Sequence, residues 1–219
     1  MSTKDCLRSL SFFSSLNEEQ IEFLASISTI NNFNKDYILH YEEKYTKYLL
    51  FLKSGLAKSY KIDKNNNEIF LYYIYENTLL SEITEIKSDE LYSFSNIELV
   101  EDSQILSIDY KQLKKHFLSQ NLLSLELMDE ILSQNKKLQT LVNRELIYDS
   151  VSKVVMMLHS DLEMFNKLKR HDIALILHIQ PATLSRVLNR LKRNKIIDII
   201  QGKVIILDAL SLENIYKED

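Results

Sequence analysis

Apolar positions change their spacing along the chain, and these changes predict different kinds of element. The apolar residues between Leu16 and Ile27 have helical spacing, and Asn17 is a suitable residue to start a helix. This segment is predicted to form a short amphipathic helix. From about Ile30 to Ile108 the apolar residues fall into short runs, which predict strands. The letters KNNN between YLLFLKSGLAKSYKID and EIFLYYIY predict a hairpin turn, and SFSNIELVEDSQILSID predicts two further strands. Closely spaced strands are typical of a compact antiparallel barrel or sandwich.

The spacing becomes helical again at Tyr110 and stays so to Tyr148 without Gly or Pro, which predicts one long helix. Gln134 and Glu145 interrupt its apolar seam. A helix of this length after a small β-domain cannot bury its seam within its own chain, so the pattern favours pairing with a second copy. An intrachain helical bundle is the alternative. The predicted dimerisation residues are Leu127, Ile131, Leu138, Leu141 and Tyr148.

The segment after Asp149 predicts three helices and a hairpin. DSVSKVVMMLHSDLEMF predicts one helix and RHDIALILHI a second, followed by a turn at residues 178–180. Pro181 suits the first position of a third helix, because its missing N–H has no partner there in any case. Two Ile/Val-rich runs around Gly202 predict the hairpin. The third helix has one apolar stripe, formed by Leu184, Val187, Leu188 and Leu191.

The opposite face of the third helix carries small, hydroxyl, amide and basic side chains. Arg can pair with guanine edges, Asn with adenine, and Ser with a base or a phosphate, which suits a helix in the major groove of DNA. Helix, turn, helix and a hairpin wing together predict a winged helix-turn-helix. The residues expected to contact DNA are Ala182, Thr183, Ser185, Arg186, Asn189, Arg190, Arg193 and, in the wing, Lys203.

Charge is unevenly distributed along the chain and agrees with a polyanion partner at one end. The net charge is −4, yet residues 166–203 hold nine Lys or Arg and two Asp, which is +7. The rest of the chain therefore carries −11. A basic module on an acidic body suits DNA binding, although a solvated helix face is the alternative explanation.

RHDIALILHIQPATLSRVLNRLKRNKIID resembles the DNA-binding domain of the Crp–Fnr family of bacterial transcription regulators, most clearly in TLSRVLNRL. YLLFLKSGLAKSYKIDKNNNEIFLYYIYENTLLSE is similar to the β-roll of that family, with Gly55 at the usual turn. The resemblance implies an α+β fold with three parts. These are a β-roll sensor domain of the cyclic-nucleotide-binding-like jelly-roll type with a short N-terminal helix (1–109), a long dimerisation helix (110–148) and a winged helix-turn-helix (149–219). It also implies a homodimer on an inverted-repeat operator, with RNA polymerase as a further partner.

The resemblance carries over to some positions of the predicted DNA-binding helix and not to others. Ser185 and Arg186 match the pair that contacts bases and phosphates in the family. Pro181 and Ala182 stand where members often have a polar or charged base reader, which puts the operator sequence in doubt. His178 stands where a turn glycine is common, but His can adopt the left-handed backbone conformation at modest cost.

Cyclic AMP is not the effector we expect. Members that bind it have a Gly-Glu pair before a short helix and then an Arg beside Ser or Thr for the cyclic phosphate. This chain has LLSE at the first place, and Ser93 and Phe94 at the second. No Arg lies between Arg8 and Arg144. Without a guanidinium or a Gly-rich backbone nest, the charge of a bound phosphate would be left largely uncompensated.

Haem is the effector that these observations leave open. One cysteine cannot hold the iron–sulfur cluster of the oxygen-sensing branch, which excludes that cofactor. We expect a pocket between the β-roll and the long helix to be lined by Tyr, Phe, Leu and Ile, which suits a planar apolar group. Some family members bind haem and respond to nitric oxide or carbon monoxide. Candidate effector-site residues are His40, Glu82 and His116, with Cys6 as a further axial ligand or as a redox thiol. A member without a small ligand is the alternative.

Two other classes of function compete with a regulator. An enzyme would be expected to carry a Gly-rich phosphate loop, H-E-x-x-H or a nucleophile elbow, and the sequence has none of them. We therefore expect no enzymatic activity and no metal site. An adaptor that uses the β-roll for small ligands and the winged helix for proteins is the second alternative. The first residues lack an apolar signal core and no run is long enough to cross a bilayer, so we expect a cytoplasmic protein.

Overall fold

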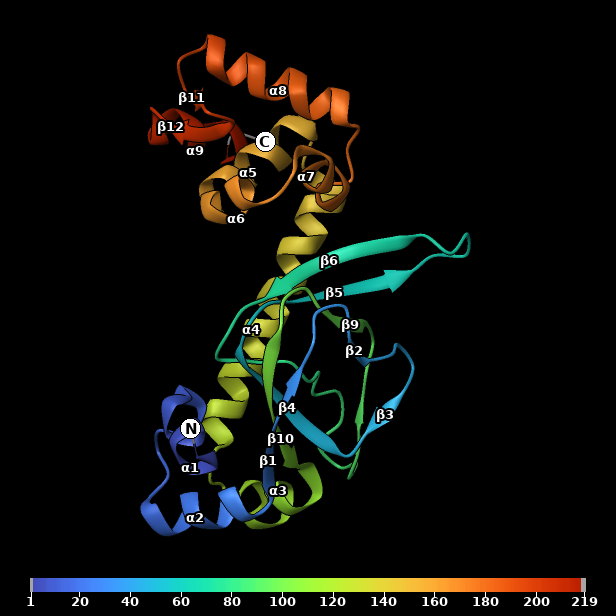
Figure 1. Ribbon diagram of the computed structural model, residues 1–219, viewed down its shortest axis with the longest axis vertical. Helices are drawn as coiled ribbons and strands as arrows, with labels where there is room; N and C mark the ends of the chain where they lie inside the picture. Colours follow the sequence, from blue (N-terminus) through green and yellow to red (C-terminus); the bar gives the residue numbers. More distant parts are fainter. Residues whose placement is uncertain (1, 218–219) are drawn as a thin grey trace. The chain divides into compact units, whose positions relative to one another are not determined.

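The structure, a computed structural model, describes residues 2–217 and forms two compact units. The first unit is Met1–Lys137 and the second is Leu138–Asp219 (Figure 1). The division falls within helix α4 (Ser124–Val142), which begins in the first unit. Each unit has its own core and is described in turn.

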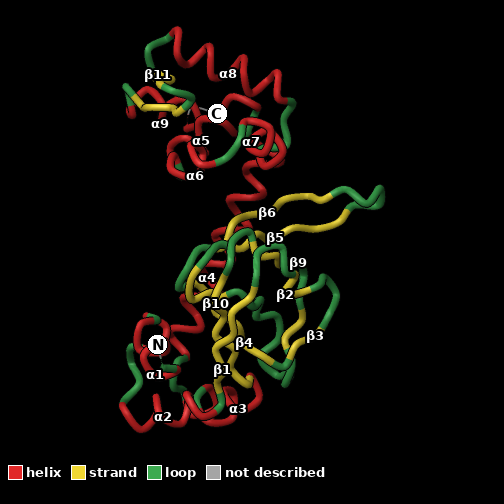
Figure 2. Tube along the Cα trace, viewed as in Figure 1, coloured by secondary structure: helices red, strands yellow, loops and turns green. Residues whose placement is uncertain are grey.

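Two four-stranded antiparallel sheets make up most of the first unit, as the run pattern predicts (Figure 2). The first sheet has the order β1 (Ser28–Phe33), β10 (Ser103–Asp109), β4 (Tyr48–Ser54) and β7 (Thr78–Leu79). The second has the order β2 (Ile38–His40), β9 (Asn96–Leu99), β5 (Ala57–Ile62) and β6 (Glu68–Ile74). A short pair joins β3 (Tyr45–Thr46) to β8 (Leu91–Tyr92). Apart from the β5–β6 hairpin, neighbours in a sheet are far apart in sequence, which is the topology expected of a β-roll.

Two predicted turns of the β-roll are confirmed. The hairpin between β5 and β6 turns at Asp63, whose carboxylate accepts the backbone N–H groups of Asn65 and Asn67 at 2.8 Å each. Gly55 joins β4 to β5 at φ +100°, where an L side chain is strained. A Cβ at this position would also lie 2.9 Å from the carbonyl oxygen of Asp102. Both the conformation and the space therefore require glycine here.

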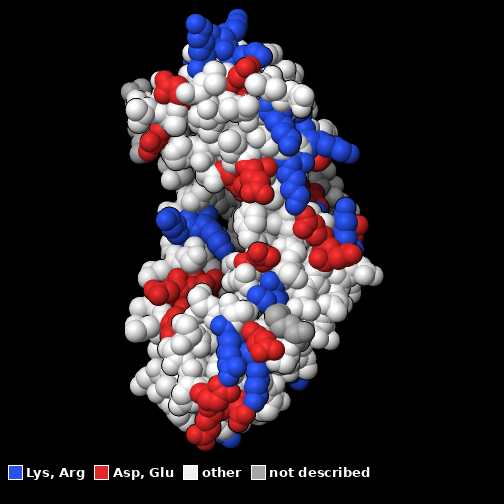
Figure 3. All heavy atoms as spheres, turned by 60° about the vertical axis from the view of Figure 1, so that its left-hand side comes forward, with Lys and Arg blue, Asp and Glu red and all other residues white. Residues whose placement is uncertain are grey.

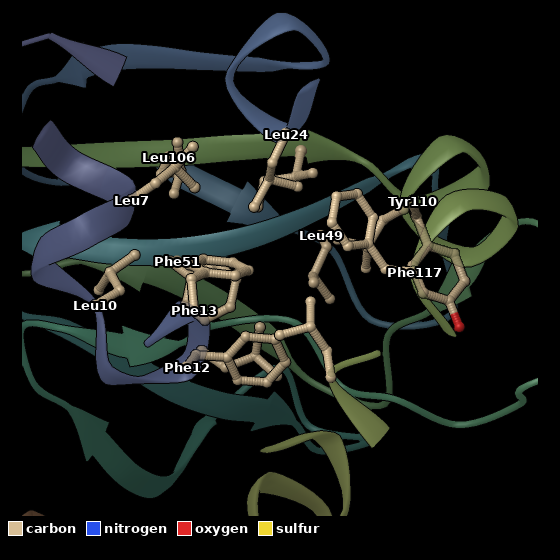
Figure 4. Packing of buried hydrophobic residues seen from close by; sticks show 14 of the residues in the cluster. Leu7, Leu10, Phe12, Phe13, Leu24, Leu49, Phe51, Leu106, Tyr110 and Phe117 are labelled. Atoms are coloured by element: carbon tan, nitrogen blue, oxygen red, sulfur yellow. The ribbon is translucent and has the colours of Figure 1, made fainter. Parts of the chain in front are cut away.

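Helices close one end of the β-roll and share its main core (Figure 4). The predicted helix is confirmed as α2 (Glu18–Ser26), and Asn17 and Gln20 form its capping box. Helix α1 (Thr3–Ser9) and the 3-10 helix η1 (Ser11–Phe13) precede it and were not predicted. The rings of Phe12, Phe13 and Phe51 meet with centroids 5.0–5.3 Å apart. These edge-to-face contacts join η1 to strand β4.

The prediction of one continuous helix from Tyr110 is wrong. The segment forms α3 (Tyr110–His116), the 3-10 helix η2 (Leu118–Gln120) and α4, which continues into a π-helical turn, η3 (Asn143–Ile147). Asn121 and Leu123 have φ of 59° and 63°, so the helical backbone is interrupted between η2 and α4. Leu122 and Leu123 pack on the main core, and this burial stabilises the interruption. The segment contains no Gly or Pro, and the spacing of its apolar residues alone does not indicate the break.

The predicted dimer seam is also wrong in part. Leu127 lies in the main core of the first unit with 6% of its surface exposed, so no partner can contact it. Ile131 and Leu138 are exposed, whereas Leu141 and Tyr148 are half-buried. Gln134 does not interrupt a seam, because its amide donates to the carbonyl of Ser81 at 3.1 Å. The exposed apolar residues of α4 that the sequence analysis missed are Leu125, Met128, Leu132 and Val142.

In the described part of the second unit, five helices and a two-stranded hairpin follow α4 and η3. The first predicted helix is in fact two, α5 (Ser150–Ser160) and α6 (Leu162–Lys167), because Asp161 ends one and caps the other. Helix α7 (Arg170–Ile176), helix α8 (Pro181–Arg193) and the hairpin of β11 (Ile197–Ile200) and β12 (Lys203–Ile206) agree with prediction. Helix α9 (Ala209–Lys217) was not predicted. Within residues 2–217, no helix has the length and apolar character needed to span a membrane.

Candidate DNA-binding surface

Helix α8 divides into a buried face and a charged face. Leu184, Val187, Leu188 and Leu191 are all buried, as their spacing predicts. Pro181 occupies the first turn, and Gln180 before it is extended with φ −71° and ψ 143°. The four side chains attach α8 to the rest of the second unit, so the helix presents its other face to solvent.

The turn before α8 depends on His178. Its φ is 52°, which confirms the prediction that a histidine adopts the left-handed conformation at this place. The His178 N–H donates to Leu175 O at 3.1 Å, and the next N–H, of Ile179, donates to Ala174 O at 3.0 Å. These bonds end α7 in the way a C-terminal glycine usually does. They also set the angle at which α8 leaves the turn.

The wing is attached to the helices by two polar side chains that the sequence analysis missed. Asn166 binds Val204 twice, with its amide donating at 2.9 Å and its carbonyl accepting at 2.7 Å. Arg170 donates to the carbonyl of Gly202 at 2.8 Å, and its guanidinium lies 4.9 Å from the ring centroid of Phe165. Burial lowers the pKa of Arg170. Arg170 contributed to the charge count, but nothing in its spacing indicated a role in fixing the wing.

The predicted DNA-contacting residues lie together on the exposed face of α8 and the start of β12. Arg186 donates to the hydroxyl of half-buried Thr183 at 3.1 Å, which holds the guanidinium along the helix. In Figure 3, Lys and Arg atoms form the uppermost group, over α8. A hollow of about 830 Å³ is lined by Arg186, Asn189, Arg190, Lys192 and Arg193. The remaining predicted residues, all exposed, are Ala182, Ser185 and Lys203.

Three cationic or ionisable groups meet around one carboxylate in the second unit. Glu145, in the π-helical turn, lies 2.9 Å from His178 Nδ1, 2.7 Å from Arg144 Nε and 3.5 Å from Lys153 Nζ. Burial would raise the pKa of Glu145, but the hydrogen bonds of His178 and Arg144 outweigh it and hold that pKa below its usual value. The carboxylate thus joins the residues before α5 to the turn before α8. In the sequence alone, Glu145 is only a polar interruption of the predicted apolar seam.

The candidate effector residues of the first unit lie in different surroundings. Cys6 is buried in the main core, where burial raises the pKa of its thiol. His116, at the end of α3, packs on the ring of Phe23 with centroids 4.5 Å apart. His40, in β2, is buried, its Nε2 has no hydrogen-bond partner, and burial lowers its pKa to about 4. Among residues 2–217, no group of three or more His, Cys, Asp or Glu is arranged to hold a metal ion.

Glu82, a further candidate effector residue, is held by donors of Phe94 and Ser95. Its carboxylate accepts the backbone N–H of Phe94 and, at 3.0 Å, the hydroxyl of Ser95. Burial raises the pKa of Glu82, and the hydrogen bonds of Phe94 and Ser95 oppose that shift. Because these donors already bind an internal carboxylate, they are not available to a phosphate.

Polar side chains of α4 also lie where we expected an apolar lining. Besides Gln134, these are Lys137 and the partly buried Glu130. The Lys137 ammonium lies 5.7 Å from the ring centroid of Tyr72. One carboxylate oxygen of Glu130 is buried without a hydrogen-bond partner, and burial raises its pKa. A planar apolar group would contact these polar side chains, so this part of the fold does not suit haem.

Comparisons with known proteins agree with this architecture. The family model of the Crp-like helix-turn-helix domain matches residues 151–215. The anaerobic regulatory protein of Bacillus subtilis (strain 168) is 23% identical over 203 residues, which cover 88% of this chain and 85% of that protein. These matches support a transcription regulator of the Crp–Fnr type, and residues 151–215 match a Crp-like helix-turn-helix domain.

Solved structures share this fold over most of the chain. A transcriptional regulator of the crp/fnr family from Eubacterium rectale has a TM-score of 0.65 at 17% identity and covers 95% of this chain and 98% of its own. A CooA mutant from Carboxydothermus hydrogenoformans has a TM-score of 0.72 at 19% identity, with coverage of 91% and 92%. The first unit of this chain thus has the cyclic-nucleotide-binding-like fold of these structures.

Proposed function

We propose that this regulator is a homodimer that recognises an inverted-repeat operator through α8, in response to an effector other than cyclic AMP. The observation that carries the proposal is the division of α8 into a buried apolar stripe and an exposed face of Arg, Asn and Ser. The eight predicted residues from Ala182 to Lys203 are the proposed DNA contacts. Helix α8 reads base edges in the major groove, and Lys203 in the wing contacts the phosphate backbone.

We also propose how two copies meet. Leu125, Met128 and Leu132 are exposed on α4 at positions i, i+3 and i+7. This is the a and d spacing of a two-stranded coiled coil, and water would otherwise cover the three side chains. The pairing sets two copies of α8 roughly 34 Å apart, one turn of DNA. The proposal includes a division into three parts: a sensor domain (1–109), a dimerisation segment (110–148) and a DNA-binding domain (149–219). Within the dimerisation segment, α4 begins at Ser124.

Selection from a randomised pool of duplex DNA with the purified full chain tests the proposal directly. We expect enrichment of an inverted repeat with half-sites about ten base pairs apart. Binding should weaken steeply with salt, because each phosphate contact releases counterions. If no sequence is enriched and binding does not depend on salt, the winged helix does not serve DNA. The adaptor function would then replace the regulator.

Arg186→Ala tests the assignment of the reading face. We expect loss of about 1–3 kcal/mol of specific binding to the selected operator, measured by fluorescence anisotropy. Lys64→Ala is the matched control, because Lys64 is an exposed lysine in the β5–β6 turn, outside the second unit. Equal affinity of the Arg186 variant and the wild type would show that α8 is not the recognition helix.

Haem remains our hypothesis for the effector because one residue, His40, could ligate it. The buried Nε2 of His40 has no hydrogen-bond partner, as a haem ligand requires. The polar side chains of α4 disfavour haem only where a bound haem would contact them. Titration of the full chain with haemin tests this. A Soret shift that saturates at one haem per chain and disappears in His40→Ala supports the hypothesis. An unchanged shift in that variant refutes His40 as the ligand, and no shift at all removes haem.

A further inference from the structure

A hollow on the first unit has a lining unlike that of any other surface described above. It measures about 330 Å³ and lies between the β3–β8 pair and the loop that precedes β8. Three aromatic rings, two carboxylates and two hydroxyls make up its lining. The lining residues are Tyr45, Thr84, Glu85, Ser88, Glu90, Tyr92 and Phe94. None of these seven is basic.

The aromatic rings are fixed by the strands that carry them. Tyr45 and Tyr92 are directly opposite across the β3–β8 pair, and their ring centroids are 5.1 Å apart. Phe94 meets Tyr92 edge to face, at 5.0 Å and 77°. Yet Tyr45 is 65% and Phe94 55% exposed, so much of the surface of these rings faces water. Exposed aromatic rings that hold one another in position are typical of a recognition surface.

Hydrogen bonds from residues outside the hollow fix the backbone of its lining loop. The N–H of Phe94 donates to the carboxylate of Glu82, which fixes the backbone at that ring. The ammonium of Lys114, from α3, donates to the carbonyl of Ser88 at 2.8 Å and also pairs with Asp89. The hydroxyl of Ser88 in turn accepts the N–H of Glu90 at 3.0 Å. These bonds keep the loop that carries the two lining carboxylates beside the rings.

Charge around the hollow favours a cation. Burial raises the pKa of the Tyr92 hydroxyl, and the nearby carboxylates of Glu43 and Glu42 add to that shift. The ammonium of Lys47 is 4.0 Å from Glu90, but its side chain is 77% exposed. Such a loose surface pair contributes little, so a bound cation would displace it easily.

We propose that this hollow binds a small organic cation with a quaternary ammonium head. The faces of Tyr and Phe rings carry partial negative charge and attract a cation that lies against them. A methylated ammonium is weakly hydrated and apolar at its surface, so it gains from the rings and from Glu85 and Glu90 together. A divalent metal ion suits the site less well, because no group of three metal-ligating side chains was found among residues 2–217. The proposal concerns binding to the first unit and does not depend on DNA recognition.

Isothermal titration calorimetry of the full chain with choline tests the proposal. Its neutral isostere 3,3-dimethylbutan-1-ol has the same shape without the charge and serves as the ligand control. We expect saturable binding of choline at millimolar concentration and binding of the isostere at least about ten-fold weaker. Equal binding of the two would show an apolar hollow rather than a cation site. No saturation by choline up to about 50 mM would refute the proposal outright.

Variants assign the binding to these residues. Tyr45→Leu removes a ring and keeps apolar bulk, and we expect it to weaken choline binding about two- to five-fold. Glu85→Gln should weaken it by a similar factor, because it removes a charge without changing shape. Tyr45→Phe keeps the ring and Tyr37→Leu changes an exposed tyrosine outside the hollow, so both should bind as the wild type does. Full affinity in Tyr45→Leu and Glu85→Gln would place any choline site elsewhere and overturn the assignment.

Discussion

Glu145→Gln is the change that best tests how the helix-turn-helix is held in its orientation. The wild-type carboxylate neutralises Arg144 and Lys153, both buried, and holds His178 in the turn before α8. Glutamine has the same shape and can still accept a hydrogen bond. The substitution therefore removes the charge while it leaves the packing almost unchanged.

The expected cost follows from the burial of the groups with which Glu145 pairs. Breaking a fully buried ion pair costs about 3–5 kcal/mol, because a charge is left uncompensated. Glu145, however, retains 29% of its side-chain surface, so solvent screens part of the interaction. We expect about 1–2 kcal/mol of lost stability, confined to the second unit.

Hydrogen exchange followed peptide by peptide measures this effect, because it reports the two units separately. A loss of about 1–2 kcal/mol makes exchange about five- to thirty-fold faster in peptides of α7 and α8. Peptides of the β-roll should exchange as in the wild type. Operator affinity should fall together with the protection of the turn.

Glu163→Gln is the matched control, since Glu163 is an exposed carboxylate on α6 of the same unit. We expect it to change exchange by less than a factor of about three. If Glu145→Gln exchanges no faster than this control, the carboxylate does not hold the turn, and packing of the apolar stripe alone orients α8.

Two further predictions concern the stability of the first unit and of the wing. Gly55→Ala should cost about 1–3 kcal/mol, whereas Gly202→Ala, at φ +80° with open space around it, should cost only about 1 kcal/mol, both measured by urea unfolding. Because His40 titrates near pH 6.5 when unfolded and near pH 4 when folded, its contribution to stability is complete above pH 6.5 and is lost as the pH falls toward 4. Between pH 6.5 and 4.5 the wild type should lose about 2–3 kcal/mol more than His40→Gln, and equal losses would refute this account.

Local patterns were sufficient to predict the elements that fold by local rules. Asn17 caps α2 through a hydrogen bond three residues away, and the α8 stripe requires only that one face be buried. The left-handed turn at His178 and the β11–β12 hairpin at Gly202 follow from backbone preferences of single residues. For these features the sequence contains the whole physical cause within a few positions.

Contacts between distant residues decided what could not be predicted. Leu127 has the spacing of a dimer seam, but the core formed by α1, η1 and β4 buries it. Gln134 fits the same helix, yet a carbonyl more than fifty residues earlier in the chain binds its amide. The effector region of the β-roll is made almost entirely of such contacts, and Glu82 is held by donors twelve and thirteen residues away. The proposed DNA contacts therefore lie mainly on one short helix that can be read directly, whereas the candidate effector residue Glu82 is held by contacts that form only when the chain folds. The organic-cation hollow follows the same rule, since its rings become neighbours only when β3 pairs with β8.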